Sequence, residues 1–119
     1  MPTLLVKSRH HAYICQSQRC FYCNAPMWEG DPTSFVAQYR VPKRLAQRLQ
    51  CTAEHLTPKC DGGADSKENI VAACLHCNST RHKFRTPPDP ERYRQHVQRR
   101  VAQGKWQPKP LQPLLRSRG

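Results

Sequence analysis

The stretch from residue 51 to residue 78 reads CTAEHLTPKCDGGADSKENIVAACLHCN, and most of the fold can be predicted from it. A predicted strand over Cys51–Leu56, which ends before Pro58, and a short apolar stretch, Asn69–Ala73, flank a turn whose two glycines suit positive φ angles. A strand, a glycine turn and a second strand predict a β-hairpin. A helix is predicted to follow from Cys74 to about Phe84. This order of elements predicts an α+β fold.

Two C-x2-C pairs frame this stretch, Cys20 with Cys23 before it and Cys74 with Cys77 near its end. Two such pairs can bring four thiolates to one tetrahedral zinc ion. Four thiolates leave no open coordination position, so this zinc would be structural. Binding of zinc at such a site contributes about 10–16 kcal/mol, comparable to the stability of a whole domain. We therefore expect the zinc-free chain to be poorly folded.

The chain is strongly basic, with 20 Lys and Arg against 8 Asp and Glu in 119 residues, a net charge of +12. Residues 80–119 carry 11 of these basic residues, with Asp89 and Glu91 as the acidic ones. Such an excess indicates a polyanionic partner, with nucleic acid as the first candidate. A basic tail that only solubilises the protein is the alternative.

Three cysteines, Cys15, Cys51 and Cys60, remain outside the two pairs, which makes an odd total of seven. We expect no leader peptide, because the apolar start of the chain runs into Lys7-Ser8-Arg9. No apolar run is long enough to predict a membrane span. These patterns favour metal-binding cysteines in a reducing, cytoplasmic compartment over a disulfide framework.

The remaining elements are predicted from local patterns. We expect a helix from Ser8 to about Gln18, a tight turn at the first cysteine pair, a strand from Ser34 to Arg40, and a short basic amphipathic helix over Pro42–Gln50. The sequence Thr86-Pro-Pro-Asp-Pro90 interrupts the chain, so we divide it into residues 1–86 and residues 87–119. The second part is predicted as a basic helix, from Pro90 to Gln103, with Asp89 as N-cap and Gly104 beyond its end, followed by a Pro-rich disordered or docking tail.

From Cys20 to about Lys83 the sequence resembles the HNH endonuclease family, the His-metal finger or ββα-metal nucleases, in its four-cysteine zinc-bound form. The resemblance is carried by Glu54-His55, Asn69 and Asn78, which follow each other between the two zinc knuckles. His55, Asn69 and Asn78 are separated by 14 and 9 positions. It implies a small zinc-stabilised ββα-metal core with flanking helices, and makes residues 1–86 the nuclease domain.

The resemblance also implies roles for individual residues. His55 would be the general base that takes a proton from the attacking water, and Asn69 would brace the loop that positions it. Glu54 and Asn78 would bind one divalent cation, with His82 as a further ligand. Mg²⁺ or Mn²⁺ is the expected cation, and Ni²⁺ becomes suitable where histidine joins the ligands. Phosphate contacts are expected from Arg81, Lys83 and Arg85, and from Lys43, Arg44 and Arg48 of the predicted basic helix.

Two features of the sequence depart from the family pattern or complicate it. The family more often has Asp where this chain has Glu54, whose side chain is one methylene longer. Consecutive residues of a regular strand also point to opposite faces, so Glu54 and His55 can share a site only where the strand ends or twists. The resemblance implies that this happens before Pro58.

Three functions are compatible with these observations. The first is a metal-dependent endonuclease that hydrolyses DNA phosphodiester bonds, which would favour a homodimer if both strands are cut. The second is a catalytically silent zinc module that binds nucleic acid. The third is a zinc domain whose basic tail binds an acidic protein. The intact set of Glu54, His55 and Asn78 favours the nuclease.

Overall fold

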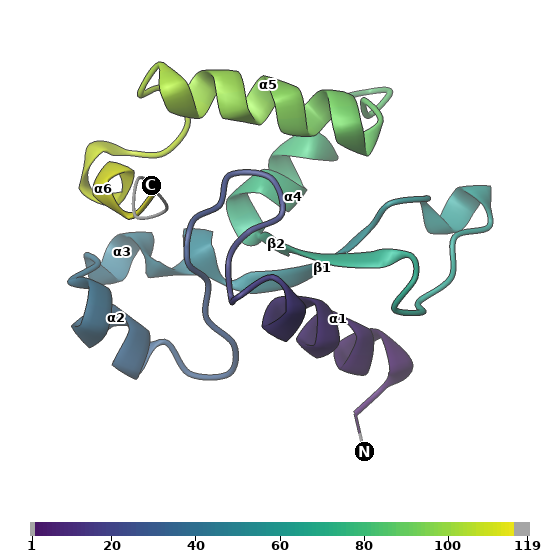
Figure 1. The fold of residues 1–119 in the computed structure, drawn as a ribbon, viewed down its shortest axis with the longest axis horizontal. Helices are drawn as coiled ribbons and strands as arrows, with labels where there is room; N and C mark the ends of the chain where they lie inside the picture. Colours follow the sequence, from purple (N-terminus) through teal and green to yellow (C-terminus); the bar gives the residue numbers. More distant parts are fainter. Residues whose placement is uncertain (1, 116–119) are drawn as a thin grey trace.

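A two-stranded antiparallel hairpin followed directly by a helix forms the centre of the protein (Figure 1). The structure is a computed structural model and describes residues 2–115. Strand β1 (Cys51–His55) pairs with β2 (Ile70–Cys74), so that Cys51 faces Cys74 and His55 faces Ile70. Helix α4 (Leu75–Arg81) begins at the end of β2. The predicted α+β fold with a ββα core is confirmed.

Helix α1 (Leu4–Cys15) covers one side of the hairpin and α4 lies on the other (Figure 1). The helix begins before the predicted Ser8, because Thr3 caps it by accepting a hydrogen bond from the Val6 amide at 3.2 Å. It ends before the predicted Gln18, because Ser17 and Gln18 have φ angles of 56° and 65°. Beyond the helix, the side-chain amide of Gln16 donates to the Ala72 carbonyl and accepts from the Ala72 amide, at 2.9 Å each. These two hydrogen bonds provide partners for backbone groups at the free edge of β2.

The prediction of a strand from Ser34 to Arg40 is wrong, because this segment forms helix α2 (Thr33–Tyr39). Asp31 accepts hydrogen bonds from the Thr33 amide and hydroxyl, which starts the first turn. Phe35 and Tyr39 lie four positions apart, and their ring centroids are 4.9 Å apart on one face of the helix. The chain then leaves the helix through Arg40, which has a φ of 55°.

The predicted basic helix near residues 42–50 is present as two short pieces, α3 (Lys43–Ala46) and the 3₁₀ helix η1 (Gln47–Leu49). Leu45 and Leu49 are buried and anchor it to the core. The indole of Trp28 donates to the Ala46 carbonyl at 2.8 Å. These contacts leave Lys43 and Arg44 exposed.

Helix α5 (Pro90–Ala102) is confirmed with its predicted ends, since Asp89 accepts from the Arg92 amide and Gly104 has a φ of 70°. The described part of the tail contains the 3₁₀ helix η3 (Lys109–Leu111) and α6 (Gln112–Leu115). It docks through the buried side chains of Leu111 and Leu115, and the rest of the predicted tail lies outside the described residues.

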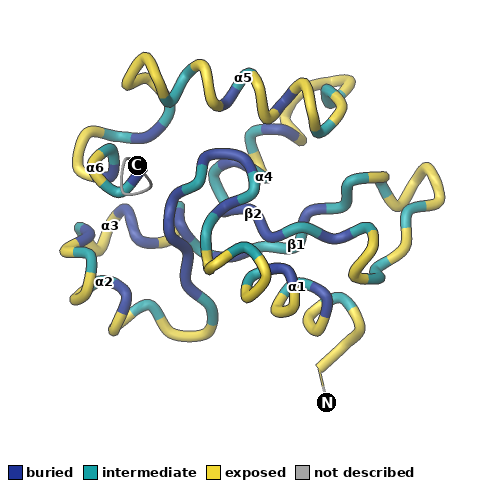
Figure 2. The backbone as a smooth tube through the Cα atoms, viewed as in Figure 1, coloured by how far each residue is buried: buried dark blue, intermediate teal, exposed yellow. Residues whose placement is uncertain are grey.

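A single hydrophobic core joins the elements (Figure 2). It contains the four knuckle cysteines together with residues from α5 and the tail, such as Tyr93, Val97 and Leu111. Residues on both sides of position 86 therefore pack together, and a domain boundary there stays a prediction. No helix among residues 2–115 combines the length and the apolar character that crossing a bilayer requires.

Candidate functional site

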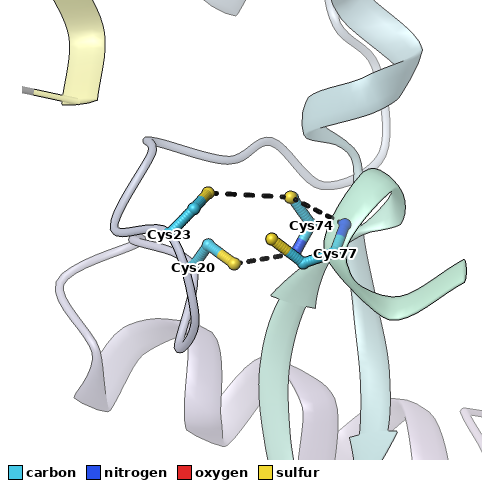
Figure 3. Close-up of side chains that lie close together, drawn as sticks. All are labelled: Cys20, Cys23, Cys74 and Cys77. Atoms are coloured by element: carbon cyan, nitrogen blue, oxygen red, sulfur yellow. Dashed lines mark hydrogen bonds between the residues drawn. The ribbon is translucent and has the colours of Figure 1, made fainter. Parts of the chain in front are cut away.

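Four buried cysteines form the first candidate site (Figure 3). The sulfur atoms of Cys20, Cys23, Cys74 and Cys77 all lie within 4.8 Å of one another, and those of Cys23 and Cys74 are 3.9 Å apart. A tetrahedral ion with Zn–S bonds of about 2.3 Å needs sulfur atoms roughly 3.8 Å apart. The cluster therefore fits zinc, as predicted from the two knuckles.

N–H groups surround these sulfur atoms. The amides of Tyr22 and Cys74 donate to Cys20 Sγ at 3.4 and 3.3 Å, and the indole of Trp106 donates to Cys77 Sγ at 3.2 Å. Gln107 reaches the sulfur atoms of both knuckles at 3.9 Å. Such donors stabilise thiolates over thiols. Trp106 and Gln107 could not be predicted here from the sequence, because only tertiary packing brings the tail to the knuckles.

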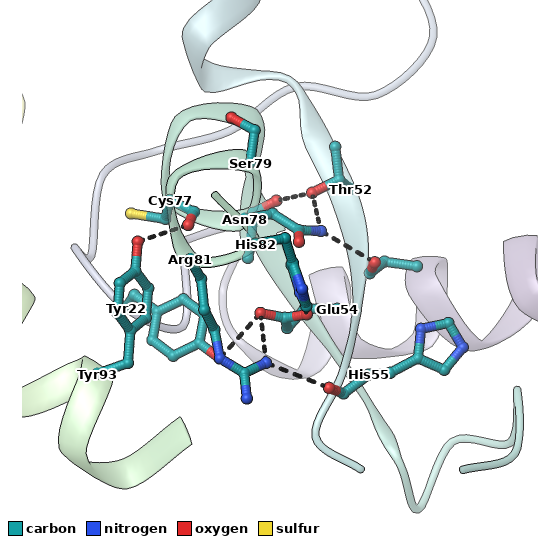
Figure 4. Close-up of polar contacts among 12 residues, drawn as sticks. Tyr22, Thr52, Glu54, His55, Cys77, Asn78, Ser79, Arg81, His82 and Tyr93 are labelled. Carbon is teal, nitrogen blue, oxygen red and sulfur yellow. Dashed lines mark hydrogen bonds and ion pairs between the residues drawn. The ribbon is translucent and has the colours of Figure 1, made fainter. Parts of the chain in front are cut away.

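The second candidate site centres on Glu54, whose side chain is 1% exposed (Figure 4). Its Oε2 atom accepts hydrogen bonds from the Tyr22 hydroxyl and from Arg81 Nη1, both at 3.1 Å. Burial, together with the Glu54 charge, raises the pKa of Tyr22, so the phenol stays protonated and donates. The other oxygen, Oε1, lies 3.0 Å from His82 Nε2. Because two donors occupy Oε2, Glu54 can offer a cation one oxygen, Oε1.

Helix α4 brings two further ligand atoms to this carboxylate. His82 follows the helix and is 41% exposed, so the site opens to solvent on its side. Asn78 donates both amide hydrogens to β1, to Thr52 Oγ1 at 3.0 Å and the Ala53 carbonyl at 3.1 Å. Its Oδ1 has no hydrogen-bond partner among residues 2–115 and remains a potential ligand. Within those same residues, the four cysteines are the one group of three or more His, Cys, Asp or Glu side chains placed to hold a metal ion. Glu54 and His82 do not form such a group by themselves. A cation bound at Glu54 therefore needs the Asn78 amide oxygen as a further ligand.

The imidazole of His55 points away from Glu54 (Figure 4). Strand β1 stays regular through the His55–Ile70 pair, so adjacent side chains project to opposite faces. His55 Nε2 instead lies 2.8 Å from Asp65 Oδ1. The hydrogen bond to His55 lowers the pKa of Asp65, so the stabilisation from this contact is complete above the ordinary carboxyl pKa of about 3.9 and is lost as the pH falls through the lowered pKa. Asp65 was not predicted, because its position depends on how the loop folds.

Asn69 ties that loop together. Its side chain accepts from the Thr57 amide at 2.8 Å and donates to the carbonyls of Thr57 and Ala64 at 3.0 and 2.9 Å. These bonds join the two ends of the loop next to Asp65. The bracing role that the resemblance implies for Asn69 stays a prediction, for which these hydrogen bonds supply the contacts.

The comparison with known protein families supplies the decisive observation. Residues 42–84 match the model described as HNH endonuclease. This segment is an HNH domain. No curated protein and no solved structure gave a match. The matched segment contains the hairpin, α4 and the second zinc knuckle, whereas the first knuckle and α5 lie outside it.

The six basic residues expected to contact phosphate occupy different environments around the HNH domain. Lys83 and Arg85 are exposed just after α4, and Lys43 and Arg44 are exposed on α3. Arg48 is half-buried and donates to Gln107 Oε1 at 3.1 Å. Arg81 is 2% exposed and is bound to Glu54 and to the Pro88 carbonyl, so its guanidinium is not accessible to a phosphate. Its role in the HNH domain is to pair with Glu54.

Proposed function

We propose that this chain is a metal-dependent endonuclease that hydrolyses DNA phosphodiester bonds. The observation that supports it best is the cluster of Glu54, His82 and Asn78 at the solvent edge of the HNH domain, in a chain of net charge +12. A buried carboxylate facing a histidine and an amide is a suitable ligand set for a divalent cation. The positive charge suits a nucleic-acid substrate.

The ligand atoms would be Glu54 Oε1, His82 Nε2 and Asn78 Oδ1, and Mg²⁺ or Mn²⁺ is the expected cation. When bound, such a cation stabilises charge on the phosphate and on the departing oxygen. Tyr22 and Arg81 hold the Glu54 carboxylate in one orientation through its Oε2 atom. Holding a ligand in this way keeps Oε1 directed toward His82 and preorganises the site.

His55 would be the general base. Asp65 accepts the hydrogen of Nε2, which leaves Nδ1 of a neutral ring to take a proton from water. Because the ring lies across β1 from Glu54, the substrate phosphate has to sit over the end of the strand for both side chains to act on it. Asn69 supports this arrangement by fixing the loop that carries Asp65.

Cleavage of supercoiled plasmid by the zinc-loaded chain tests the proposal, with Mg²⁺ or Mn²⁺ against EDTA. We expect metal-dependent nicking that His55→Ala lowers by about 100- to 10,000-fold, the usual contribution of a general base. His11→Ala, a change at an exposed histidine of α1, is the matched control and keeps full activity. Zinc content and circular dichroism establish that both variants fold. Nicking that survives His55→Ala contradicts the assignment of the base.

A catalytically silent module that binds nucleic acid is the second candidate, and two observations favour it. Arg81 already neutralises Glu54, and His55 is turned toward Asp65. This candidate predicts DNA binding that weakens steeply with salt, but no cleavage of plasmid, branched DNA or RNA with any cation.

Two further proposals concern the oligomeric state of the protein and its cellular compartment. A lone active site cuts one strand at a time, so double-strand cleavage would favour a homodimer, which we propose in that case. We also propose a reducing intracellular compartment, because zinc-binding thiolates and the exposed Cys15 and Cys60 would oxidise elsewhere.

A further inference from the structure

Phe84 is an aromatic ring left open to solvent immediately beyond the HNH helix. It is 47% exposed, whereas the other exposed large apolar side chains among residues 2–115 are aliphatic and belong to α1. The ring borders a hollow of about 230 Å³. The remaining lining residues are Pro88, Arg92, Tyr93 and His96. Phe84 and His96 are the aromatic lining side chains that keep exposed surface, since Tyr93 is fully buried, and Pro88 and Arg92 complete the lining.

The hollow and the Glu54 site share one rigid framework. Arg81 donates from Nη1 to Glu54 and from Nε to the Pro88 carbonyl at 3.0 Å, so one side chain connects the two places. Tyr93 provides a second connection. Its ring packs edge-on against Tyr22, with centroids 4.7 Å apart, and Tyr22 donates to Glu54. The Tyr93 hydroxyl is itself fixed by a 2.6 Å hydrogen bond to the Cys77 carbonyl.

The charges around the hollow favour an anionic polymer. Lys83 and Arg85 are exposed on either side of Phe84, and the Arg92 side chain at the rim is 83% exposed. Asp89 is the acidic neighbour, and Arg92 pairs with it at 3.6 Å. Three basic side chains, one of them paired with Asp89, therefore lie near the exposed Phe84 ring, and Glu91 is a further acidic residue next to Arg92 in the sequence. Aromatic faces with basic residues beside them are the usual means of binding unpaired bases, because every base has a π face.

We infer that this hollow receives an unstacked nucleobase of the DNA strand whose phosphodiester lies at Glu54 and Asn78. The inference rests on the proposed nuclease function and extends it to a class of substrate. A base can enter only when it has left the duplex, so DNA with a bulged, mismatched or flapped nucleotide is bound in preference to perfect duplex. Since the contacts are made to ring faces, the preference does not depend on which base is unpaired.

The test measures binding rather than cleavage, with zinc-loaded full-length protein carrying His55→Ala to prevent cutting. The probe is a duplex with a single bulged 2-aminopurine, beside the same duplex without the bulge. We expect quenching of 2-aminopurine fluorescence and tighter binding of the bulged duplex. Adding Phe84→Ala should weaken that binding by roughly 5- to 150-fold, the effect of losing one base–aromatic stack, and leave perfect duplex nearly unchanged.

Three further variants make the result specific to stacking. Phe84→Tyr keeps the ring and should keep the preference, whereas Phe84→Leu keeps apolar volume without a π face and should lose it. Ile14→Ala removes an equally exposed apolar side chain from α1 and should change nothing. Equal binding of both duplexes by the parent protein, or no effect of Phe84→Ala, overturns the inference; a surface for an apolar protein side chain would give this result.

Failure of this inference is distinguishable from failure of the proposed function. If the unmodified protein nicks plasmid but Phe84→Ala leaves the preference for the bulged duplex unchanged, the base site is wrong and the nuclease stands. If the bulged base is bound through Phe84 and no cation supports cleavage, the base site stands on a silent module.

Discussion

At the scale of single residues, the pairing of Glu54 with Arg81 is the most consequential contact in the protein. Both side chains are almost fully buried, and Tyr22 adds a neutral donor to the same carboxylate. A buried carboxylate is tolerated only when charge and hydrogen bonds compensate for its lost hydration. Arg81 therefore allows an acidic ligand to be built into the core of a small domain, with one oxygen left for a cation.

Replacing Arg81 with Met should destabilise the zinc-loaded protein by about 3–5 kcal/mol, because Glu54 would remain buried without its counter-charge. Arg85→Met, at an exposed position four residues beyond Arg81, should change stability by less than about 0.5 kcal/mol. Urea unfolding at neutral pH measures both. An Arg81→Met protein as stable as the parent would show that Glu54 is hydrated or protonated in the fold.

At the scale of elements, the conformation of the loop between β1 and β2 is fixed by hydrogen bonds of its own backbone and of the Asn69 side chain. Gly63 makes this possible, since a Cβ atom there would lie 1.8 Å from the Thr57 carbonyl oxygen and 2.9 Å from Asn69 Nδ2. Gly62 is required for a different reason. It has a φ of 88° but open space around it.

The two glycines should therefore respond differently to alanine. Gly62→Ala should reduce the free energy of unfolding by about 1–2 kcal/mol, through the strain of a left-handed residue, while the loop keeps its shape. Gly63→Ala should push Thr57 away from Asn69 and reduce stability by about 1–3 kcal/mol. Amide hydrogen exchange separates the two cases, because Gly63→Ala alone should expose the Thr57 amide. Slow exchange at Thr57 in both variants would contradict this account.

The elements differ in how far sequence could predict them. The hairpin, α4 and α5 follow from local signals, which include apolar segments, paired glycines, an Asp N-cap and a terminal glycine. A strand and a helix are both compatible with the sequence of α2, because four apolar residues among seven suit either period, and the start of the helix depends on the Asp31 side chain. The contacts of His55 with Asp65 and of Arg81 with Glu54 join segments 10 and 27 positions apart, which no local pattern encodes.

At the scale of the whole molecule, the C-terminal segment completes the zinc site. Leu111 and Leu115 dock it into the core, and Trp106 and Gln107 then donate to the cysteine sulfur atoms. Arg19, next to the first knuckle, also donates to the Leu114 carbonyl at 3.4 Å, across 95 positions. The part of the chain beyond the HNH match thus contributes to the same metal centre as the part before it.

Removing the indole N–H tests this contribution. Trp106→Phe keeps an aromatic ring in the contact with His76 but leaves Cys77 Sγ without its 3.2 Å donor. Zinc affinity should fall by about 10- to 100-fold, the usual effect of losing an outer hydrogen bond to a ligand. Competition with a chromophoric chelator measures the affinity. Gln103→Ala, at an exposed position before the tail, is the control and should bind zinc normally. An unchanged affinity in Trp106→Phe would show that the hydrogen bond does not stabilise the thiolate.

The two zinc knuckles are separated by 50 residues, and this separation affects how the chain folds. A growing chain offers the metal two sulfur atoms long before the other two exist. The ion must then close a long loop, so the folding rate should depend on the concentration of free zinc as well as on the chain. Two unfinished chains can also bind one zinc ion together, each through the two cysteines of its first knuckle. Refolding at high protein concentration and low zinc should therefore form metal-bridged pairs, which disappear when zinc is in excess.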